Sequence, residues 1–134
     1  MTPPQSGGGE GERLRTPPRE RFALPMEFFD LEAAAAELAA EPSPAMQGHR
    51  QKMLYRHGGT SVSLFLFDAG AGLREHRTNG TVLIQALSGR LRVEAEGRPH
   101  EVSAGRLLVM SPGVPHDVHA LEASRMLLTV SLGG

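Results

Sequence analysis

From Gly48 onward the sequence is a succession of short apolar or alternating runs, each ended by a turn of a few residues. The clearest run is SVSLFLF at residues 61–67, and glycine pairs or Ser-Gly and Glu-Gly steps separate its successors. The predicted strands are residues 50–57, 61–67, 73–76, 81–87, 90–95, 99–102, 106–110, 116–120 and 125–132. Short strands at such regular spacing predict an all-β barrel or sandwich. Because no repeat and no second helical block supports a parallel sheet, we predict a small antiparallel barrel.

One helix is predicted ahead of these strands, over residues 28–41. Asp30 is a suitable N-cap, the strong helix formers LEAAAAELAAE follow, and two prolines then end the run. The apolar contacts expected of this helix are Leu31 and Leu38 on one face, with Phe28 and Phe29 as anchors just ahead. Alanine buries little surface, so the helix is expected to lie across a larger body.

The chain of 134 residues has the size of one domain, and its composition divides it into three segments. Residues 1–24 are predicted to be a disordered tail, because the first 21 residues hold four prolines, four glycines and seven charges. Residues 25–47 form the predicted helical segment, and residues 48–134 the predicted barrel.

Charge and cysteine content exclude several classes of protein. Fourteen basic and fifteen acidic residues give a net charge of −1, which carries no nucleic-acid signature. The absence of cysteine excludes disulfides, Cys-ligated zinc, iron–sulfur clusters and thiol nucleophiles, so a metal would need carboxylates or the six histidines. No apolar run approaches the roughly 18 residues that span a bilayer, and no secretory signal pattern is present. We therefore expect a cytoplasmic protein that binds neither nucleic acid nor membranes.

Two stretches carry glycine, histidine and proline at characteristic spacings. Residues 70–89 read GAGLREHRTNGTVLIQALSG, and residues 105–120 read GRLLVMSPGVPHDVHA. Together they resemble the two motifs of the cupin superfamily, whose members are small jelly-roll β-barrels of the RmlC-like type. The spacings from Gly70 to His76 and from Gly105 to His116 match without a gap, and so does the closing Gly89. The resemblance covers about residues 48–132.

The residues themselves agree with this fold. Gly89 lies between two β runs, where a tight turn needs a positive φ. Alternation along a strand places His76 and Thr78 on one face, and His116 and Val118 on one face of another strand. In the cupin arrangement those faces line the barrel interior.

The resemblance implies a metal site with two histidines and a glutamate from the first motif and one histidine from the second. His76 and His116 match, but Thr78 stands at the second histidine and Val82 at the glutamate. A divalent Fe, Mn, Ni or Zn ion needs about three protein ligands. Two imidazoles and a hydroxyl fall short, so the sequence predicts a depleted metal site with His76 and His116 as its remaining ligands.

Several other side chains are possible ligands, and each has a plainer explanation. Arg74 can hold a carboxylate or phosphate near the barrel mouth, or can simply face solvent. The further candidate metal ligands, each more readily explained as solvated or structural, are His57, Glu75, His100, Asp117 and His119. Residues expected in the core or a pocket wall are Leu83, Leu108, Met110 and Met126, with Tyr55 in either place.

Three functions follow from this inventory. The leading one is a barrel that binds or senses a small molecule, in a pocket formed by Arg74, His76, Thr78, Val82 and His116. The second is a metal-dependent cupin enzyme (a dioxygenase, isomerase or decarboxylase) in which an unrecognised further ligand joins His76 and His116 at the metal. A less favoured form of this hypothesis is a metal-free enzyme with His76 or His116 as acid or base. The third is an interaction module with a filled interior. A homodimer is expected, with residues 50–57 as a candidate surface.

Overall fold

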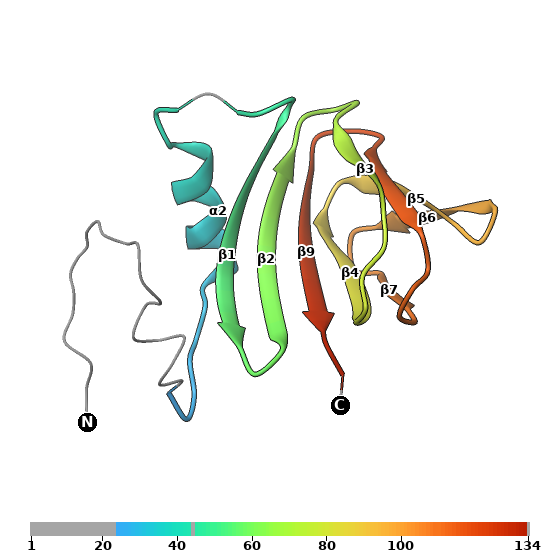
Figure 1. The fold of residues 1–134 in the computed structure, drawn as a ribbon. Helices are drawn as coiled ribbons and strands as arrows, with labels where there is room; N and C mark the ends of the chain where they lie inside the picture. Colours follow the sequence, from blue (N-terminus) through green and yellow to red (C-terminus); the bar gives the residue numbers. More distant parts are fainter. Residues whose placement is uncertain (1–23, 44, 134) are drawn as a thin grey trace.

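The computed structural model describes residues 24–43 and 45–133, which form two antiparallel sheets and one helix (Figure 1). The larger sheet has the strand order β1-β2-β9-β4-β7, and the smaller one has the order β3-β8-β5-β6. The elements are α2 (Leu31–Ala39), β1 (His49–His57), β2 (Thr60–Phe67), β3 (Gly72–His76), β4 (Thr81–Ser88), β5 (Arg90–Ala95), β6 (Arg98–Ser103), β7 (Leu107–Met110), β8 (His116–Ala120) and β9 (Ser124–Ser131). The predicted all-β jelly roll with one N-terminal helix is confirmed.

Each predicted strand is present, and no bound differs by more than one residue. The largest extension is in β6, which pairs with β5 along its whole length up to Ala95 opposite Arg98. Glu96 and Gly97 join the two strands with φ values of 56° and 74°. Two consecutive positive φ angles are typical of the tight hairpin turn that matches the twist of the strands. The ladder therefore continues to the turn itself.

Apolar side chains fill the space between the two sheets. In β4 every second residue is buried, which places Val82 and Ile84 in the interior. Met110 and Met126 are buried and Leu108 is partly buried against the same core, as expected. The prediction for Leu83 was wrong: it pairs with Val109 and lies on the opposite face of the sheet, because alternation turns it away from its buried neighbours. The interior is a packed core.

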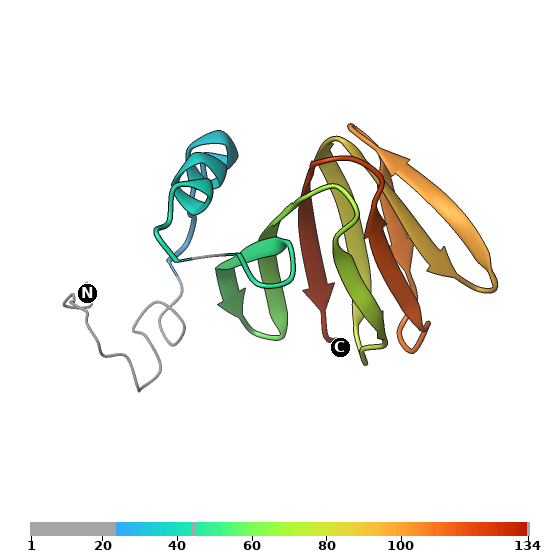
Figure 2. The same cartoon turned by 90° about the horizontal axis from the view of Figure 1, so that it is seen from above.

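The helix covers part of the outer face of the larger sheet, as Figure 2 shows from above. It is shorter than predicted and begins after Asp30, whose carboxylate accepts a hydrogen bond from the Ala33 amide at 3.0 Å. Leu38 packs with Leu64 in a second core cluster. The prediction of Phe28 as an anchor was wrong: it lies ahead of the extended N-cap residue and is 91% exposed.

The predicted disordered tail lies, apart from its last residue, outside the described part of the chain. Within the described ranges, no helix has the length and apolar character needed to cross a bilayer.

Candidate functional site: the His76–His116 pair

Two strands of the smaller sheet bring His76 and His116 together. His76 is the last residue of β3 and His116 the first of β8, and the two are direct partners in the antiparallel ladder. Their ring centroids lie 4.3 Å apart with the planes inclined by 60°. Histidines separated by 40 positions in sequence are therefore neighbours in the fold.

Both rings are held in the same way by the backbone. Nδ1 of His76 lies 2.9 Å from the carbonyl oxygen of Arg74, and Nδ1 of His116 lies 3.0 Å from that of Val114. A carbonyl oxygen only accepts hydrogen bonds, so each Nδ1 carries the proton and donates it. In the neutral form of each ring Nε2 is then left with its lone pair. The pair presents two hydrogen-bond acceptors.

The two histidines differ in their surroundings. His116 is 2% exposed, and its Nε2 has no hydrogen-bond partner among the described residues, whereas His76 is exposed. Burial lowers the pKa of His116 below its ordinary value, against an opposing effect of the hydrogen bond to Val114. Near His116, His76 lowers that pKa further and Asp117 raises it. The buried ring is therefore held neutral, with an acceptor that lacks a donor.

The two positions where the cupin pattern has further ligands offer nothing comparable. The hydroxyl of Thr78 accepts from the Gly80 amide at 3.0 Å and lies 3.1 Å from the Gly80 carbonyl oxygen, so it is engaged in a local turn. β3 ends at His76, so the strand alternation that was expected to align Thr78 with it does not extend that far. Val82 is buried in the core and has no donor or acceptor atom in its side chain.

Other candidate ligands lie away from the pair or are already engaged. Asp117 and His119 alternate with the buried residues of β8 and pair with each other at 3.5 Å. Nε2 of His100 lies 3.2 Å from the carbonyl oxygen of Ala95. Within residues 24–43 and 45–133, no group of three His, Asp or Glu side chains is placed to hold a metal ion. The side chains of these two ranges therefore do not fit a resident transition metal, which needs about three protein ligands.

Arg74 takes part through its backbone. The register of β3 shifts between Leu73 and His76, and the exposed Arg74 lies within this irregular stretch. The carbonyls of Arg74 and Val114, each two residues before a histidine, fix the two rings, and residue types alone gave no signal of this. The Thr78 carbonyl accepts from the Gly113 amide at 2.8 Å, which ties together the two loops that lead into the site.

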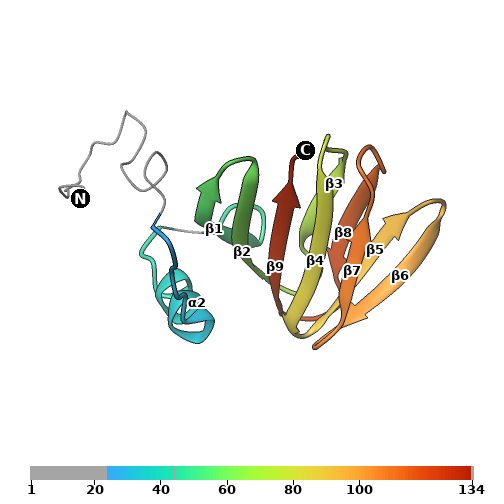
Figure 3. The ribbon, with the colours of Figure 1, turned by 90° about the horizontal axis from the view of Figure 1, so that it is seen from below.

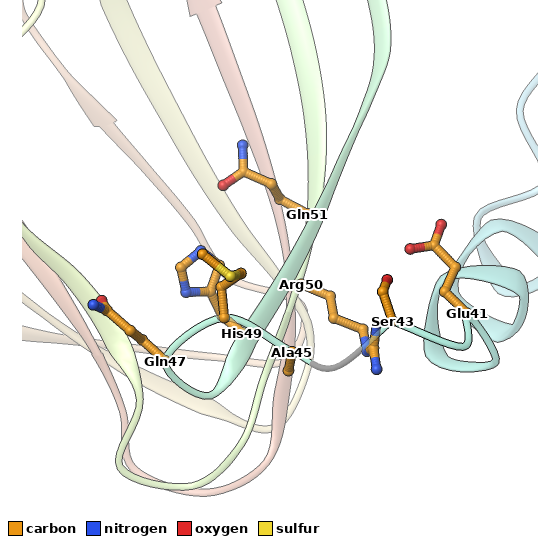
Figure 4. A pocket seen from close by; sticks show the side chains of 8 residues that line it. Glu41, Ser43, Ala45, Gln47, His49, Arg50 and Gln51 are labelled. Carbon is orange, nitrogen blue, oxygen red and sulfur yellow. The ribbon is translucent and has the colours of Figure 1, made fainter. Parts of the chain in front are cut away.

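An open pocket of about 450 Å³ lies elsewhere, where the chain passes from α2 into β1 (Figure 4). Its lining residues are Glu41, Ser43, Ala45, Met46, Gln47, His49, Arg50 and Gln51. The His49 ring lies about 6 Å from the rings of Phe65 and Phe67. This packing accounts for the position of His49 as part of the fold.

Comparison with known proteins decides the family. Residues 63–131, slightly more than half of the chain, match the sequence profile of the cupin domain family. The chain is a cupin. A search of curated proteins gave no match.

Solved structures agree with this assignment. This cupin is 26% identical to a conserved protein of unknown function from Streptococcus pyogenes, with a TM-score of 0.62 over 66% of this chain and 77% of that one. A second match, at 20% identity and a TM-score of 0.62, is an RmlC-like cupin from Shewanella frigidimarina, covering 66% and 79%. A third is KdgF from a Halomonas species, at 24% identity and a TM-score of 0.60, covering 71% and 85%. At these identities the last two show the fold alone.

Proposed function

We propose that this cupin is a small-molecule-binding or sensing module that holds its ligand at the His76–His116 pair without a resident metal. The observation that supports it is the buried Nε2 of His116, which lacks a hydrogen-bond partner among the described residues. Leaving a buried acceptor unsatisfied costs about 1–3 kcal/mol, which a ligand with a matching donor recovers on binding.

The chemistry of the pair defines the ligand class. An imidazole whose proton lies on Nδ1 accepts a hydrogen bond at Nε2 in its neutral form, so the pair favours a neutral or cationic group with O–H or N–H donors. A carboxylate or phosphate dianion offers no proton to either ring. Because buried apolar side chains such as Ile84 and Met126 occupy the space between the sheets, we place the ligand at the rim between β3 and β8.

The test is a titration followed by long-range ¹H–¹⁵N NMR of the histidine rings in the full chain. The probes are catechol, glucose and ethylamine as donors, and acetate as the donor-free control. We expect at least one donor to shift the Nε2 resonances of His76 and His116, with no response to acetate. The shift should vanish in His116→Phe and persist in His119→Gln, which changes a histidine of the same strand outside the pair.

Two outcomes overturn the proposal. One is a response to acetate equal to that of the donors, which would remove the argument from lone pairs. The other is stoichiometric transition metal in protein purified without added metal and exhaustively dialysed, lost in a His76→Gln/His116→Gln double variant. That result would favour the metal-dependent dioxygenase, isomerase or decarboxylase, which no cluster of three ligands within the described residues supports.

A second function, an interaction module without a ligand, is favoured by the filled interior. It predicts that no probe shifts the Nε2 resonances of the histidines and that the protein forms a stable oligomer. We also propose a homodimer and a cytoplasmic location, as expected from the sequence.

A further inference from the structure

The loop that joins β3 to β4 contains the dipeptide Asn79-Gly80. Asn79 is the only asparagine of the chain and is exposed, whereas Gly80 is buried. In such a dipeptide the backbone nitrogen of the glycine can attack the side-chain carbonyl carbon of the asparagine, because glycine has no side chain to block the approach. The loop therefore carries an amide that can react with its own backbone.

The fold requires glycine at position 80. Gly80 lies directly before β4, whose first residue, Thr81, pairs with Ser131 at the end of β9. Figure 3 shows the loop from β3 to β4 beside this end of β9. A Cβ on Gly80 would lie 2.7 Å from the carbonyl oxygen of Ser131 and 2.9 Å from its carbonyl carbon, which are backbone atoms and cannot turn aside. A larger residue at this position would remove the reactive dipeptide, but the contact with β9 excludes it.

Thr78 engages the backbone groups of this glycine. The Gly80 amide donates to the Thr78 hydroxyl at 3.0 Å, and the hydroxyl donates to the Gly80 carbonyl oxygen at 3.1 Å. A threonine that bonds the backbone two residues further on forms a local turn. Ring closure requires the Gly80 nitrogen to lose its proton and to turn toward Asn79, and both changes break the bond to Thr78. Reaction in the folded chain therefore requires a local opening of this loop.

We propose that Asn79 is a modification site, at which the chain loses ammonia and becomes aspartate or isoaspartate, and that the Thr78 hydroxyl restrains this conversion in the folded protein. The Gly80 nitrogen forms a bond to Cγ of Asn79, the bond from Cγ to Nδ2 breaks, and the amide proton of Gly80 leaves with Nδ2 as ammonia. Water then opens the succinimide ring. Cleavage between the ring nitrogen and Cγ gives aspartate, and cleavage between the nitrogen and the main-chain carbonyl carbon gives isoaspartate.

Isoaspartate changes the loop that leads away from His76. Its backbone runs through the former side chain and is longer by a methylene group, so the Thr78 hydroxyl no longer faces the Gly80 amide in the same geometry. The Thr78 carbonyl oxygen accepts from the Gly113 amide at 2.8 Å, so the change reaches the loop that precedes His116. Aspartate keeps the normal backbone and should leave both bonds in place.

The first test follows the conversion by mass spectrometry of the full chain, incubated at neutral pH and then digested with trypsin. Fragmentation of the peptide of residues 78–90 separates Asn79 from Gln85. The folded wild type should convert at least about tenfold more slowly than the same chain unfolded in guanidinium chloride. Thr78→Val should convert about fivefold faster than the wild type when folded, because a hydrogen bond of ordinary strength is lost, and at the wild-type rate when unfolded.

Three variants are the controls for this test. Thr78→Ser keeps the hydroxyl and should stay close to the wild-type rate, and Asn79→Gln should abolish the mass gain at position 79. Gly97→Ala strains the turn between β5 and β6, where φ is +74°, and therefore controls for a general loss of stability; it should leave the rate unchanged. Equal rates for the folded and the unfolded wild type, or for folded wild type and folded Thr78→Val, would overturn the proposal.

The second test compares the isoaspartate form, purified from aged wild type, with the variant Asn79→Asp. In ¹H–¹⁵N NMR spectra the Gly113 amide resonance should move in the isoaspartate form, because its bond to the Thr78 carbonyl is disturbed. The same resonance should stay at the wild-type position in Asn79→Asp, which adds the carboxylate without the longer backbone. An isoaspartate form with an unchanged Gly113 resonance would overturn the inferred effect of the modification on this loop.

Discussion

The interior between the sheets and the rim that carries His76 and His116 differ in the hydrogen-bonding needs of their buried groups. Side chains such as Ile84, Leu91 and Met126 are fully buried, and their apolar atoms require no hydrogen-bond partner. At the rim, His116 is just as buried but keeps an acceptor without a donor. The contrast indicates that the core holds the fold together, whereas the rim retains a polar group that burial alone makes unfavourable. We expect stability and binding to separate along this line.

The largest effect should come from opening a cavity in the core. Ile84→Ala removes a fully buried side chain between the sheets and should lower the free energy of unfolding by about 2–5 kcal/mol. Urea denaturation measures it. Leu132→Ala, at a half-exposed position, is the control and should change it by less than about 0.5 kcal/mol. If His116→Phe cost as much as Ile84→Ala, the rim would be part of the stabilising core and the comparison would fail.

The second prediction compares alanine substitutions at two glycines with positive φ, Gly89 and Gly97. A Cβ at Gly89, where φ is +82°, would collide with Ser124 and the Ala123 carbonyl. Gly97 has φ of +74° but open space around the same position. Gly89→Ala should therefore combine strain with collision and cost more than about 2 kcal/mol, and Gly97→Ala only about 1 kcal/mol for the backbone strain. Equal thermal midpoints for the two variants would contradict this explanation.

The third change acts on the loop beneath the rim. Thr78→Val removes the hydroxyl that bonds the amide of Gly80 and should cost about 1 kcal/mol. The Gly113 amide bond to the Thr78 carbonyl is unaffected, so the two histidine rings should keep their Nδ1–H tautomers. Loss of those tautomers in the ring ¹⁵N spectrum would show that Thr78 belongs to the site more directly than we infer. Thr129→Val, on β9, is the matched control.

How far the sequence predicted these regions depends on the kind of information each carries. The strands were predicted because alternation and glycine turns are local, and the His76–His116 pair because two motif spacings place it in a known fold. Neither a motif spacing nor an unambiguous local pattern fixes the positions of Leu83 and Phe28. Leu83 looks like its buried neighbours but lies at the opposite phase of β4, and Phe28 looks helical but precedes the N-cap. The carbonyl groups that accept hydrogen bonds from the two rings could not be predicted from the sequence, since every residue type has a backbone carbonyl.

The smallest expected effect is the dependence of stability on pH. Burial holds the pKa of His116 below its ordinary value of 6.5, so between that value and the lower folded one the unfolded state binds more protons than the folded state. The contribution of neutral His116 to stability is therefore fully present above pH 6.5 and is lost as the pH falls toward the folded pKa. Urea midpoints from pH 8 to pH 5 should show a fall in the wild type that is smaller in His116→Phe and retained in His119→Gln. A donor ligand at the rim should make the urea midpoint fall more steeply with decreasing pH, because protonation of Nε2 removes the lone pair that the ligand needs. If bound ligand left the pH dependence of the midpoint unchanged, the ligand would bind elsewhere.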